Sequence, residues 1–338
     1  MDRAAIVSLV AYAKEKPVLN VKAALVALVS ILGISASHAQ TDVSMITDFG
    51  FNGRHAYFYV ALDKGYYKQE GLNMTILRGQ GSGDAIKKVA AGAAMFGFAD
   101  AGSLVLARGN DKVPVKLVAV VYLQPPQALF VLDSSDIKKP KDLEGKTLAE
   151  TPAGAIRLMF PAYAKAAGID ESKVKWVAAD SAALPSILAA KRADAIGQFL
   201  VGEPLIAAAT APEKVRALAY KDVGLTYYGN GLIASEETIA AKPELVRAYV
   251  RATIKGMKDA FADPKAAAVI MNKYQKQLSP EVIEGETKLV GELATIKGTP
   301  LGKIDPARID ETVKVIGSAF KLETPVKPAD LFAAGFVE

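Results

Sequence analysis

The stretch from Asp48 to Tyr59 combines an acid, a carboxamide, a histidine and several aromatic rings. It follows an apolar run, 43–46, that predicts a buried strand, and it leads into a predicted helix, 55–64. The start of a helix after a strand leaves backbone N–H groups free, and α/β folds bind their ligands at such places. The stretch therefore predicts one wall of a ligand site.

Five side chains of this stretch are candidate ligand contacts, and each has a structural alternative. Phe49 and Phe51 can stack on a planar ligand or can fill the core beside the first strand. Asn52 and His55 can bind a heteroaromatic edge or an oxyanion, although His55 can equally cap the helix or bind a backbone carbonyl. Asp48 suits an amino group, but an acid at a strand end often caps the following helix.

Further candidates lie at other predicted strand ends and at turn-rich segments. Backbone N–H groups and a hydroxyl in the Gly-Ser-Gly turn before the predicted helix 84–91 suit a carboxylate, a sulfonate or a ring oxygen. No Lys-Ser/Thr pair follows at the spacing of a phosphate loop, and an ordinary flexible turn is the alternative. For the candidates in the second lobe and near the crossings, the alternative is a helix cap or a hinge hydrogen bond. All further candidates, including those of the Gly-Ser-Gly turn, are Gly81, Ser82, Gly83, Asp100, Ala101, Gln124, Thr151, Gly154, Gln198, Glu203 and Tyr228.

The composition argues against several kinds of chemistry. The 338 residues include no cysteine and two histidines, which excludes a thiol nucleophile, a disulfide framework and a thiolate metal site. A histidine-based metal cluster is also disfavoured, and no Gly-x-Ser-x-Gly nucleophile elbow lies beside a suitable strand. Positive and negative charges are interspersed without an arginine-rich stripe, which argues against nucleic-acid binding. We expect no cofactor.

Residues 1–39 have the pattern of an export signal. Basic residues precede an apolar run, 23–34, and small residues follow up to Ala39. The apolar run is too short to span a bilayer comfortably. We expect cleavage near Ala39 and a periplasmic mature protein, the alternative being an amphipathic helix that the mature chain keeps.

Predicted strands and helices alternate along the rest of the chain, as in mostly parallel sheets covered by helices on both faces. The segment 124–127 interrupts this alternation and predicts a crossing between two lobes, and the segment 227–234 predicts the return crossing. We expect lobe 1 to comprise 40–126 and 231–338, and lobe 2 to comprise 127–230, with a cleft that closes by hinge motion. Helices are expected to start at Pro243, Pro264, Pro280 and Pro306, because proline favours the first helical turn.

The segment 48–61 resembles the pattern Asp-Trp-x-Pro-Asn-x-x-His-x-Gly-x-Tyr-Val-Ala of the thiamine-pyrimidine-precursor-like binding proteins of ABC importers. This group is close to the nitrate, sulfonate and taurine binding proteins. The segments 63–72, 79–101, 140–146 and 202–204 resemble later parts of the family in the same order, so the likeness covers 42 to about 260. It implies an α/β fold of the type II periplasmic binding protein clamshell, with two interdomain crossings, acting as a monomer with membrane permease subunits.

Three departures from the family pattern bear on the ligand. Phe49 replaces tryptophan, Phe51 replaces proline and Tyr57 replaces glycine, which changes the size of the pocket and its hydrogen bonds. The sequence predicts a small planar, pyrimidine-like heteroaromatic ligand, with a small organic anion such as a sulfonate, nitrate or an aromatic carboxylate as the alternative. A sensor that presents the closed lobes to a membrane receptor is a further alternative.

An enzyme on the same fold is a remote alternative. His55 with Asp48 is the one plausible acid–base pair. Fungal relatives of this family are enzymes that resemble self-consuming synthases and use a histidine with a cysteine-rich motif, and this chain has no cysteine. We therefore predict a binding protein without catalytic residues.

Overall fold

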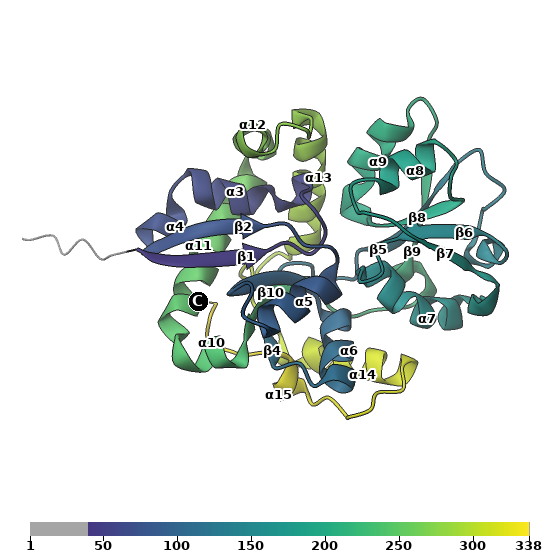
Figure 1. The fold of residues 1–338 in the computed structure, drawn as a ribbon. Helices are drawn as coiled ribbons and strands as arrows, with labels where there is room; N and C mark the ends of the chain where they lie inside the picture. Colours follow the sequence, from purple (N-terminus) through teal and green to yellow (C-terminus); the bar gives the residue numbers. More distant parts are fainter. Residues whose placement is uncertain (1–39, 338) are drawn as a thin grey trace, which may run out of the picture. The chain divides into compact units, whose positions relative to one another are not determined.

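A computed structural model describes residues 40–337. The predicted export signal, 1–39, lies outside these residues. The described chain contains two five-stranded sheets with helices packed on them (Figure 1). We call the first sheet with its helices lobe 1, and the second sheet with its helices lobe 2. No helix within 40–337 is long and apolar enough to cross a membrane.

The first sheet has the strand order β2-β1-β3-β10-β4. Strands β1 and β3 are parallel neighbours, whereas β10 runs antiparallel to both β3 and β4. The central strand β3 is buried along its whole length, which explains its apolar sequence FGFAD up to the final acid. The bounds are β1 Thr41–Ile46, β2 Leu72–Leu77, β3 Phe96–Asp100, β4 Val115–Val120 and β10 Asn230–Ser235.

The second sheet repeats this arrangement with the order β7-β6-β8-β5-β9. Its inserted strand β5 is antiparallel to β8 and β9, and its sequence QALFVL is buried throughout. In each sheet the antiparallel strand is the one that directly follows a crossing between the lobes. The bounds are β5 Gln127–Leu132, β6 Thr147–Glu150, β7 Lys175–Ala178, β8 Ala195–Phe199 and β9 Val215–Ala219.

The chain enters the second sheet at β5 and returns to the first at β10. The lobe limits at 126/127 and 230/231 stay a prediction, although Asn230, placed by the sequence at the end of lobe 2, pairs with Asp100 in the first sheet. The alternation of strands and helices along the sequence predicted the parallel strands of each sheet. It gave no signal for the antiparallel partner between β3 and β4, because that pairing joins residues far apart in the chain.

Helices of lobe 1 come from both ends of the chain. The predicted proline starts are confirmed for α11, α12, α13 and α14, and the residues before three of them cap the helix: the side chains of Asp263, Ser279 and Asp305 accept backbone N–H groups. The bounds are η1 Gly53–His55, α3 Ala56–Asp63, α4 Tyr66–Gln69, α5 Ser82–Ala90, α6 Ala101–Asp111, α10 Glu236–Ala241, α11 Pro243–Ala262, α12 Pro264–Tyr274, α13 Pro280–Ala294, α14 Pro306–Ala319 and α15 Pro328–Leu331.

Lobe 2 carries shorter helical segments between its strands. Gly168 caps the C-terminus of helix α7, and its φ of +69° is the left-handed conformation that glycine adopts readily. The bounds are η2 Pro140–Leu143, α7 Ala155–Ala167, η3 Glu171–Lys173, α8 Leu184–Ala189, η4 Leu200–Gly202, α9 Glu203–Thr210 and η5 Tyr220–Val223.

A stack of aromatic rings fixes α11 on the first sheet. The ring of Tyr249 lies parallel to that of Phe96 with 4.0 Å between centroids, and the ring of Tyr67 stacks on that of Tyr249 at 6.2 Å. All three rings are buried. Their contact therefore holds the long helix against the strand that ends at the cleft.

Replacing Tyr249 by alanine should lower the free energy of unfolding by about 3 to 5 kcal/mol, because a large buried ring leaves a cavity. Urea denaturation measures this loss. Tyr274→Ala is the matched control, since its ring is 43% exposed, and it should cost much less. Equal losses for the two variants would contradict the role given to the Tyr249 stack.

Candidate functional site

A cluster of buried polar side chains lies where the two lobes meet, and Asp48 is its centre. The two carboxylate oxygens of Asp48 accept hydrogen bonds from Arg54 Nη2 at 3.3 and 3.4 Å. His55 Nε2 lies 2.8 Å from Oδ1, and Asn230 Nδ2 donates to Oδ2 at 2.8 Å. All four side chains are fully buried. Asp48 therefore organises the cluster, and the cap of the following helical turn is Asn52 instead.

The protonation of His55 follows from its two contacts. Its Nδ1 accepts a hydrogen bond from the backbone N–H of Asn52 at 3.3 Å, so Nε2 carries the proton and donates to Asp48. Burial lowers the pKa of His55. Burial alone would raise the pKa of Asp48, but the charge of Arg54 and the bond from His55 outweigh it and lower that pKa. The pair is thus a neutral imidazole beside a carboxylate.

Arg54 reaches from lobe 1 into lobe 2. Its Nη1 donates to Gln198 Oε1 at 2.9 Å, and its guanidinium carbon lies 4.8 Å from the ring centre of Phe199 and 5.6 Å from that of Phe49. A buried charge needs both pairing and hydrogen bonds, and Asp48 supplies the opposite charge. Sequence reasoning missed Arg54, although it lies within the stretch that predicted the site.

Two glutamates outside the predicted set face this cluster. Glu286 on α13 accepts the backbone N–H of Arg54 at 2.9 Å, and Glu150 at the end of β6 accepts the N–H and hydroxyl of Thr151 at 3.0 and 3.2 Å. Burial raises the pKa of Glu286 to about 7 and that of Glu150 to about 8. A signal existed for Glu286, since it is an acid on the apolar face of α13.

Asp100 forms the next part of the cluster, at the end of β3. It accepts hydrogen bonds from the N–H and the hydroxyl of Ser103 and from Gln127 Nε2, at 2.7, 2.8 and 2.7 Å. Burial raises its pKa to about 6. Since Gln127 begins the first strand of lobe 2, this bond joins the lobes at the base of the cleft.

Several buried polar atoms of this cluster have no hydrogen-bond partner among the residues that the structure describes. They include the donor Arg54 Nε and the Tyr122 hydroxyl, which can donate or accept. Each such atom costs about 1 to 3 kcal/mol if it stays unpaired. A ligand that paired with them would recover this cost. The remaining atoms of this set are Gln127 Oε1, Glu150 Oε2, Asn230 Oδ1 and Glu286 Oε1.

The two candidate phenylalanines occupy different surroundings. Phe49 is buried in the apolar cluster of lobe 2 together with Phe130 and Leu184, although it belongs to lobe 1 by sequence. Phe51 is half-buried and meets Tyr59 edge-on, with 6.4 Å between ring centres. The side chain of Phe49, like that of Arg54, therefore reaches from lobe 1 into lobe 2.

The Gly-Ser-Gly turn contacts protein groups. The N–H of Gly83 donates to the carbonyl oxygen of Ala153 at 3.1 Å, and Ser82 Oγ accepts the N–H of Asp100 at 3.1 Å. Ala101 donates its N–H to the Gly229 carbonyl at 3.1 Å. A Cβ on Gly81 would lie 2.2 Å from the Ala153 carbonyl oxygen, so the two lobes touch through backbone here.

Of the candidates in lobe 2, three lie at the cluster. Thr151 binds Glu150, Gln198 binds Arg54, and a Cβ on Gly154 would lie 2.0 Å from Glu150 Oε1. The close approach of Glu150 explains why glycine occupies position 154.

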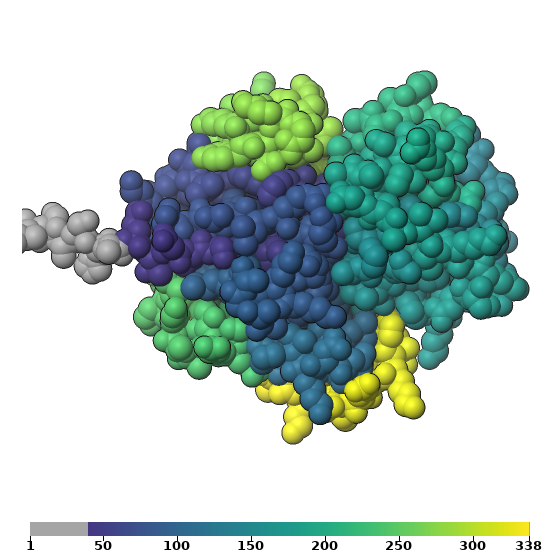
Figure 2. Space-filling model, in the orientation of Figure 1, coloured from purple at the N-terminus to yellow at the C-terminus, as the bar shows by residue number. Residues whose placement is uncertain are grey.

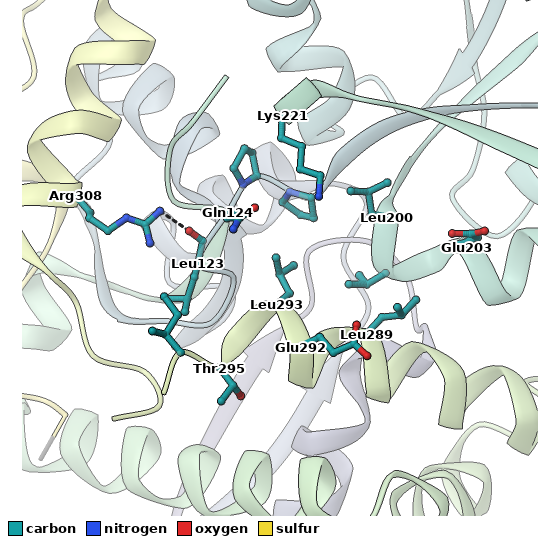
Figure 3. A pocket seen from close by; sticks show the side chains of 14 residues that line it. Leu123, Gln124, Leu200, Glu203, Lys221, Leu289, Glu292, Leu293, Thr295 and Arg308 are labelled. Carbon is teal, nitrogen blue, oxygen red and sulfur yellow. Dashed lines mark hydrogen bonds between the residues drawn. The ribbon is translucent and has the colours of Figure 1, made fainter. Parts of the chain in front are cut away.

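Three other candidates lie apart from the cluster. Gln124 and Glu203 line a pocket of about 400 Å³ between α13 and lobe 2, with Lys221, Leu293 and Arg308 around it (Figure 3). The hydroxyl of Tyr228 accepts the N–H of Asp305 at 3.1 Å, and Arg308 lies over its ring at 4.4 Å. The sequence predicted contacts for residues near a crossing, but that position alone could not tell whether a residue lines this pocket or belongs to the buried cluster.

Comparison with known proteins gives both a family match and similar folds. A family model described as NMT1/THI5 like matches residues 52–267. A formylaminopyrimidine-binding protein of Halalkalibacterium halodurans is 26% identical over 305 residues, which cover 89% of this chain and 92% of the relative. A riboflavin-binding protein of Chloroflexus aurantiacus is 29% identical over 239 residues, covering 69% of this chain and 67% of that protein.

An enzyme is also among the relatives, and a solved structure supports the fold. A 4-amino-5-hydroxymethyl-2-methylpyrimidine phosphate synthase of Legionella pneumophila is 23% identical over 254 residues, covering 72% of this chain and 77% of the enzyme. The alkanesulfonate-binding protein of Xanthomonas axonopodis pv. citri, bound to MOPS, superposes with a TM-score of 0.67 at 15% identity, covering 88% of this chain and 100% of that one. The predicted periplasmic binding protein fold is thus confirmed.

The raised pKa of Glu150 should make stability fall as pH rises. A glutamate carboxyl ordinarily has a pKa of 4.5, and burial raises the pKa of Glu150 to about 8 in the folded chain, so the folded state binds the extra proton between these values. Glu150→Gln should remove its share of this dependence, a slope of at most about 1.4 kcal/mol per pH unit, while Glu286 and Asp100, whose pKa values burial also raises, keep theirs. Denaturation from pH 5 to 8.5 measures it.

Glu144→Gln is the control for this titration. Its pKa is lowered by Lys141, so Glu144 contributes no slope between pH 5 and 8. The same pH slope in the wild type and in Glu150→Gln would show that Glu150 ionises normally.

Proposed function

Because the chain belongs to the NMT1/THI5-like family, we propose that it is the solute-binding component of an ABC importer. We propose further that its ligand is a small planar heteroaromatic molecule that carries an amino group, of the pyrimidine class. The ligand binds between the lobes, at the cluster around Asp48 and Arg54. Hinge closure brings the groups of both lobes onto it.

The observation that carries this proposal is the set of buried polar atoms without partners. Gln127 Oε1 and Asn230 Oδ1 accept hydrogen bonds. The free oxygens of Glu150 and Glu286 accept when ionised and can donate when protonated. An aminopyrimidine edge places a donating amino group beside an accepting ring nitrogen, and a carboxyl group can bind both. Arg54 Nε remains as a donor for a second ring nitrogen or a carbonyl oxygen.

The charge balance of the cluster argues against the organic anion. Arg54 is its one buried cation among the described residues, and Asp48 at 3.3 Å neutralises it. Glu150 and Glu286 add acidic groups within electrostatic reach of Arg54. A sulfonate or nitrate would enter a site with no spare positive charge and with carboxyl oxygens facing it, so its desolvation would not be compensated.

Aromatic rings supply the faces that a planar ligand needs. Phe199 lies beside Arg54, and its ring meets Tyr122 edge-on with 6.1 Å between centres. The ring of Phe49 also lies near the Arg54 guanidinium, at 5.6 Å. We therefore propose Phe49, Tyr122 and Phe199 as the stacking residues. The residues with free polar atoms would bind the ligand edge, namely Arg54, Gln127, Glu150, Asn230 and Glu286. The residues whose polar atoms are engaged would hold these groups in place, namely Asp48, Asn52, His55, Asp100, Thr151 and Gln198.

The other sequence candidates divide into two groups. Gln124, Glu203 and Tyr228 keep the predicted role and would contact solute from the neighbouring pocket. The rest would shape the cleft instead of contacting the ligand, namely Phe51, Gly81, Ser82, Gly83, Ala101 and Gly154. We also propose export through the signal 1–39 with cleavage near Ala39, a periplasmic monomer, and permease subunits as partners.

We propose binding without turnover. The acid–base pair that an enzyme would need is fully buried, and both oxygens of Asp48 are occupied by Arg54, His55 and Asn230. Conversion of a bound pyrimidine by the wild type, lost in His55→Ala, would overturn this part of the proposal.

A solute panel tests the ligand class. Thermal shift and calorimetry with aminopyrimidines, nucleobases, riboflavin, alkanesulfonates, nitrate and aromatic carboxylates should show binding of the amino-heteroaromatic members. A solute at a hundred times its Kd adds about 2.7 kcal/mol of stability. Glu150→Gln should weaken binding about 10- to 100-fold, since a bond to a buried carboxyl is lost.

Glu171→Gln is the matched control for the panel. It makes the same substitution at an exposed position outside the buried cluster and outside the neighbouring pocket, and the proposed mode of binding leaves affinity unchanged in this variant. Binding of sulfonates or nitrate with no response to aminopyrimidines would reject the proposed ligand class in favour of the anion.

A further inference from the structure

One short segment of lobe 1, residues 78–83, makes several contacts to lobe 2; we call it the closing segment. Arg78 Nη2 lies 2.7 Å from Asp180 Oδ1, and Gln80 Nε2 donates to Asp180 Oδ2 at 3.2 Å. The N–H of Gly83 donates to the Ala153 carbonyl at 3.1 Å. In these contacts lobe 1 provides the donors and lobe 2 the acceptors. The hydrogen-bonding groups of the facing surfaces are therefore complementary. Figure 2 shows lobe 1 (blue) in contact with lobe 2 (teal).

Both sides of this contact are held in place by their own lobes. Asp180 Oδ1 also accepts the N–H of Ala182 at 2.9 Å, in the turn between β7 and α8. The backbone of Gln80 donates to Asp84 Oδ2 at 2.9 Å and forms a bridge with Phe49. The Asp180 carboxylate and the backbone of Gln80 are therefore ordered by their own lobes, which reduces the entropic cost of the contact.

Gly81 limits how closely the lobes approach. Its φ is +128°, and a Cβ there would lie 2.2 Å from the Ala153 carbonyl oxygen. The obstacle is backbone from the other lobe, which cannot rotate away as a side chain can. An alanine at this position would hold the lobes apart in addition to straining its own backbone.

We propose that the closing segment and Asp180 set the balance between closed and open lobes, and through it the affinity for solute, without contacting the solute. The proposal rests on the proposed function in assigning the cleft to a solute. It changes the role of the Gly-Ser-Gly turn, because the Gly83 N–H that could bind an anion is engaged by Ala153. Apparent affinity scales with the fraction of molecules in the binding-competent state.

The ion pair and the steric limit at Gly81 contribute differently to the balance between closed and open lobes. The Arg78 and Asp180 side chains are 34% and 47% exposed, so their pair should shift the closed-to-open ratio by only about 1.5- to 5-fold, and less at high salt. The steric limit at Gly81 does not depend on salt. Salt dependence therefore separates the two contributions.

Distance measurements between labelled cysteines test the proposal without any solute. The natural sequence has no cysteine, so Ala93→Cys in lobe 1 and Ala166→Cys in lobe 2, both exposed, can be spin-labelled alone. Pulsed electron paramagnetic resonance then gives the distribution of distances between the lobes. Circular dichroism establishes that each variant is folded.

In this background Asp180→Asn should increase the population with longer distances about 1.5- to 5-fold. The reversed pair, Arg78→Asp with Asp180→Arg, should restore the original distribution. Gly81→Ala should remove most of the shorter-distance population. Asp136→Asn is the matched control, because the Asp136–Lys146 pair lies within lobe 2 at 2.7 Å, and it should leave the distribution unchanged.

Unchanged distances in folded Asp180→Asn and Gly81→Ala would overturn the proposal. A solute panel without any binder leaves these distances measurable, so failure of the proposed function appears as a separate result. If a solute is found, Gly81→Ala should weaken its binding without changing which solutes bind. A changed solute preference would instead mean that the turn contacts the solute.

Discussion

The burial of the Arg54 charge is the constraint on which the rest of the site depends. A guanidinium fully removed from water needs an opposite charge and hydrogen bonds, and these come from Asp48 in lobe 1 and Gln198 in lobe 2. His55 and Asn230 are in turn fixed by the same carboxylate. Because one charge is compensated from both lobes, the geometry at the base of the cleft and the approach of the lobes are coupled.

The sequence predicted most of the elements because their signals are local. Apolar runs gave the strands, and proline in the first helical turn gave the starts of α11, α12, α13 and α14. The turn-rich segments predicted two crossings between the sheets, and the lobe limits placed there stay a prediction. The insertion of β5 and β10 as antiparallel strands could not be predicted, since it depends on pairing between distant segments.

Only part of the candidate site could be predicted, because local sequence signals indicate strand ends but not contacts across the cleft. Strand ends indicated Asp48, Asp100, Thr151 and Gln198, and the structure brings them together. Whether a polar side chain faces solvent or a buried partner depends on the opposite lobe, so the sequence could not separate Gln127 or Glu150 from ordinary strand residues. The same limit applies to Phe49, whose neighbours belong to the apolar cluster of lobe 2. Residues that act across the cleft carry no periodic signal.

The shared strand order of the two sheets has a consequence for synthesis of the chain. The second sheet uses strands from one continuous segment, β5 to β9, whereas the strand next to β4 in the first sheet is β10. A ribosome therefore releases every strand of lobe 2 before it releases the strand that gives β4 its partner. Since domains fold as units during synthesis, the lobe in the middle of the chain can complete its sheet first. The lobe that begins the chain waits for Asn230–Ser235.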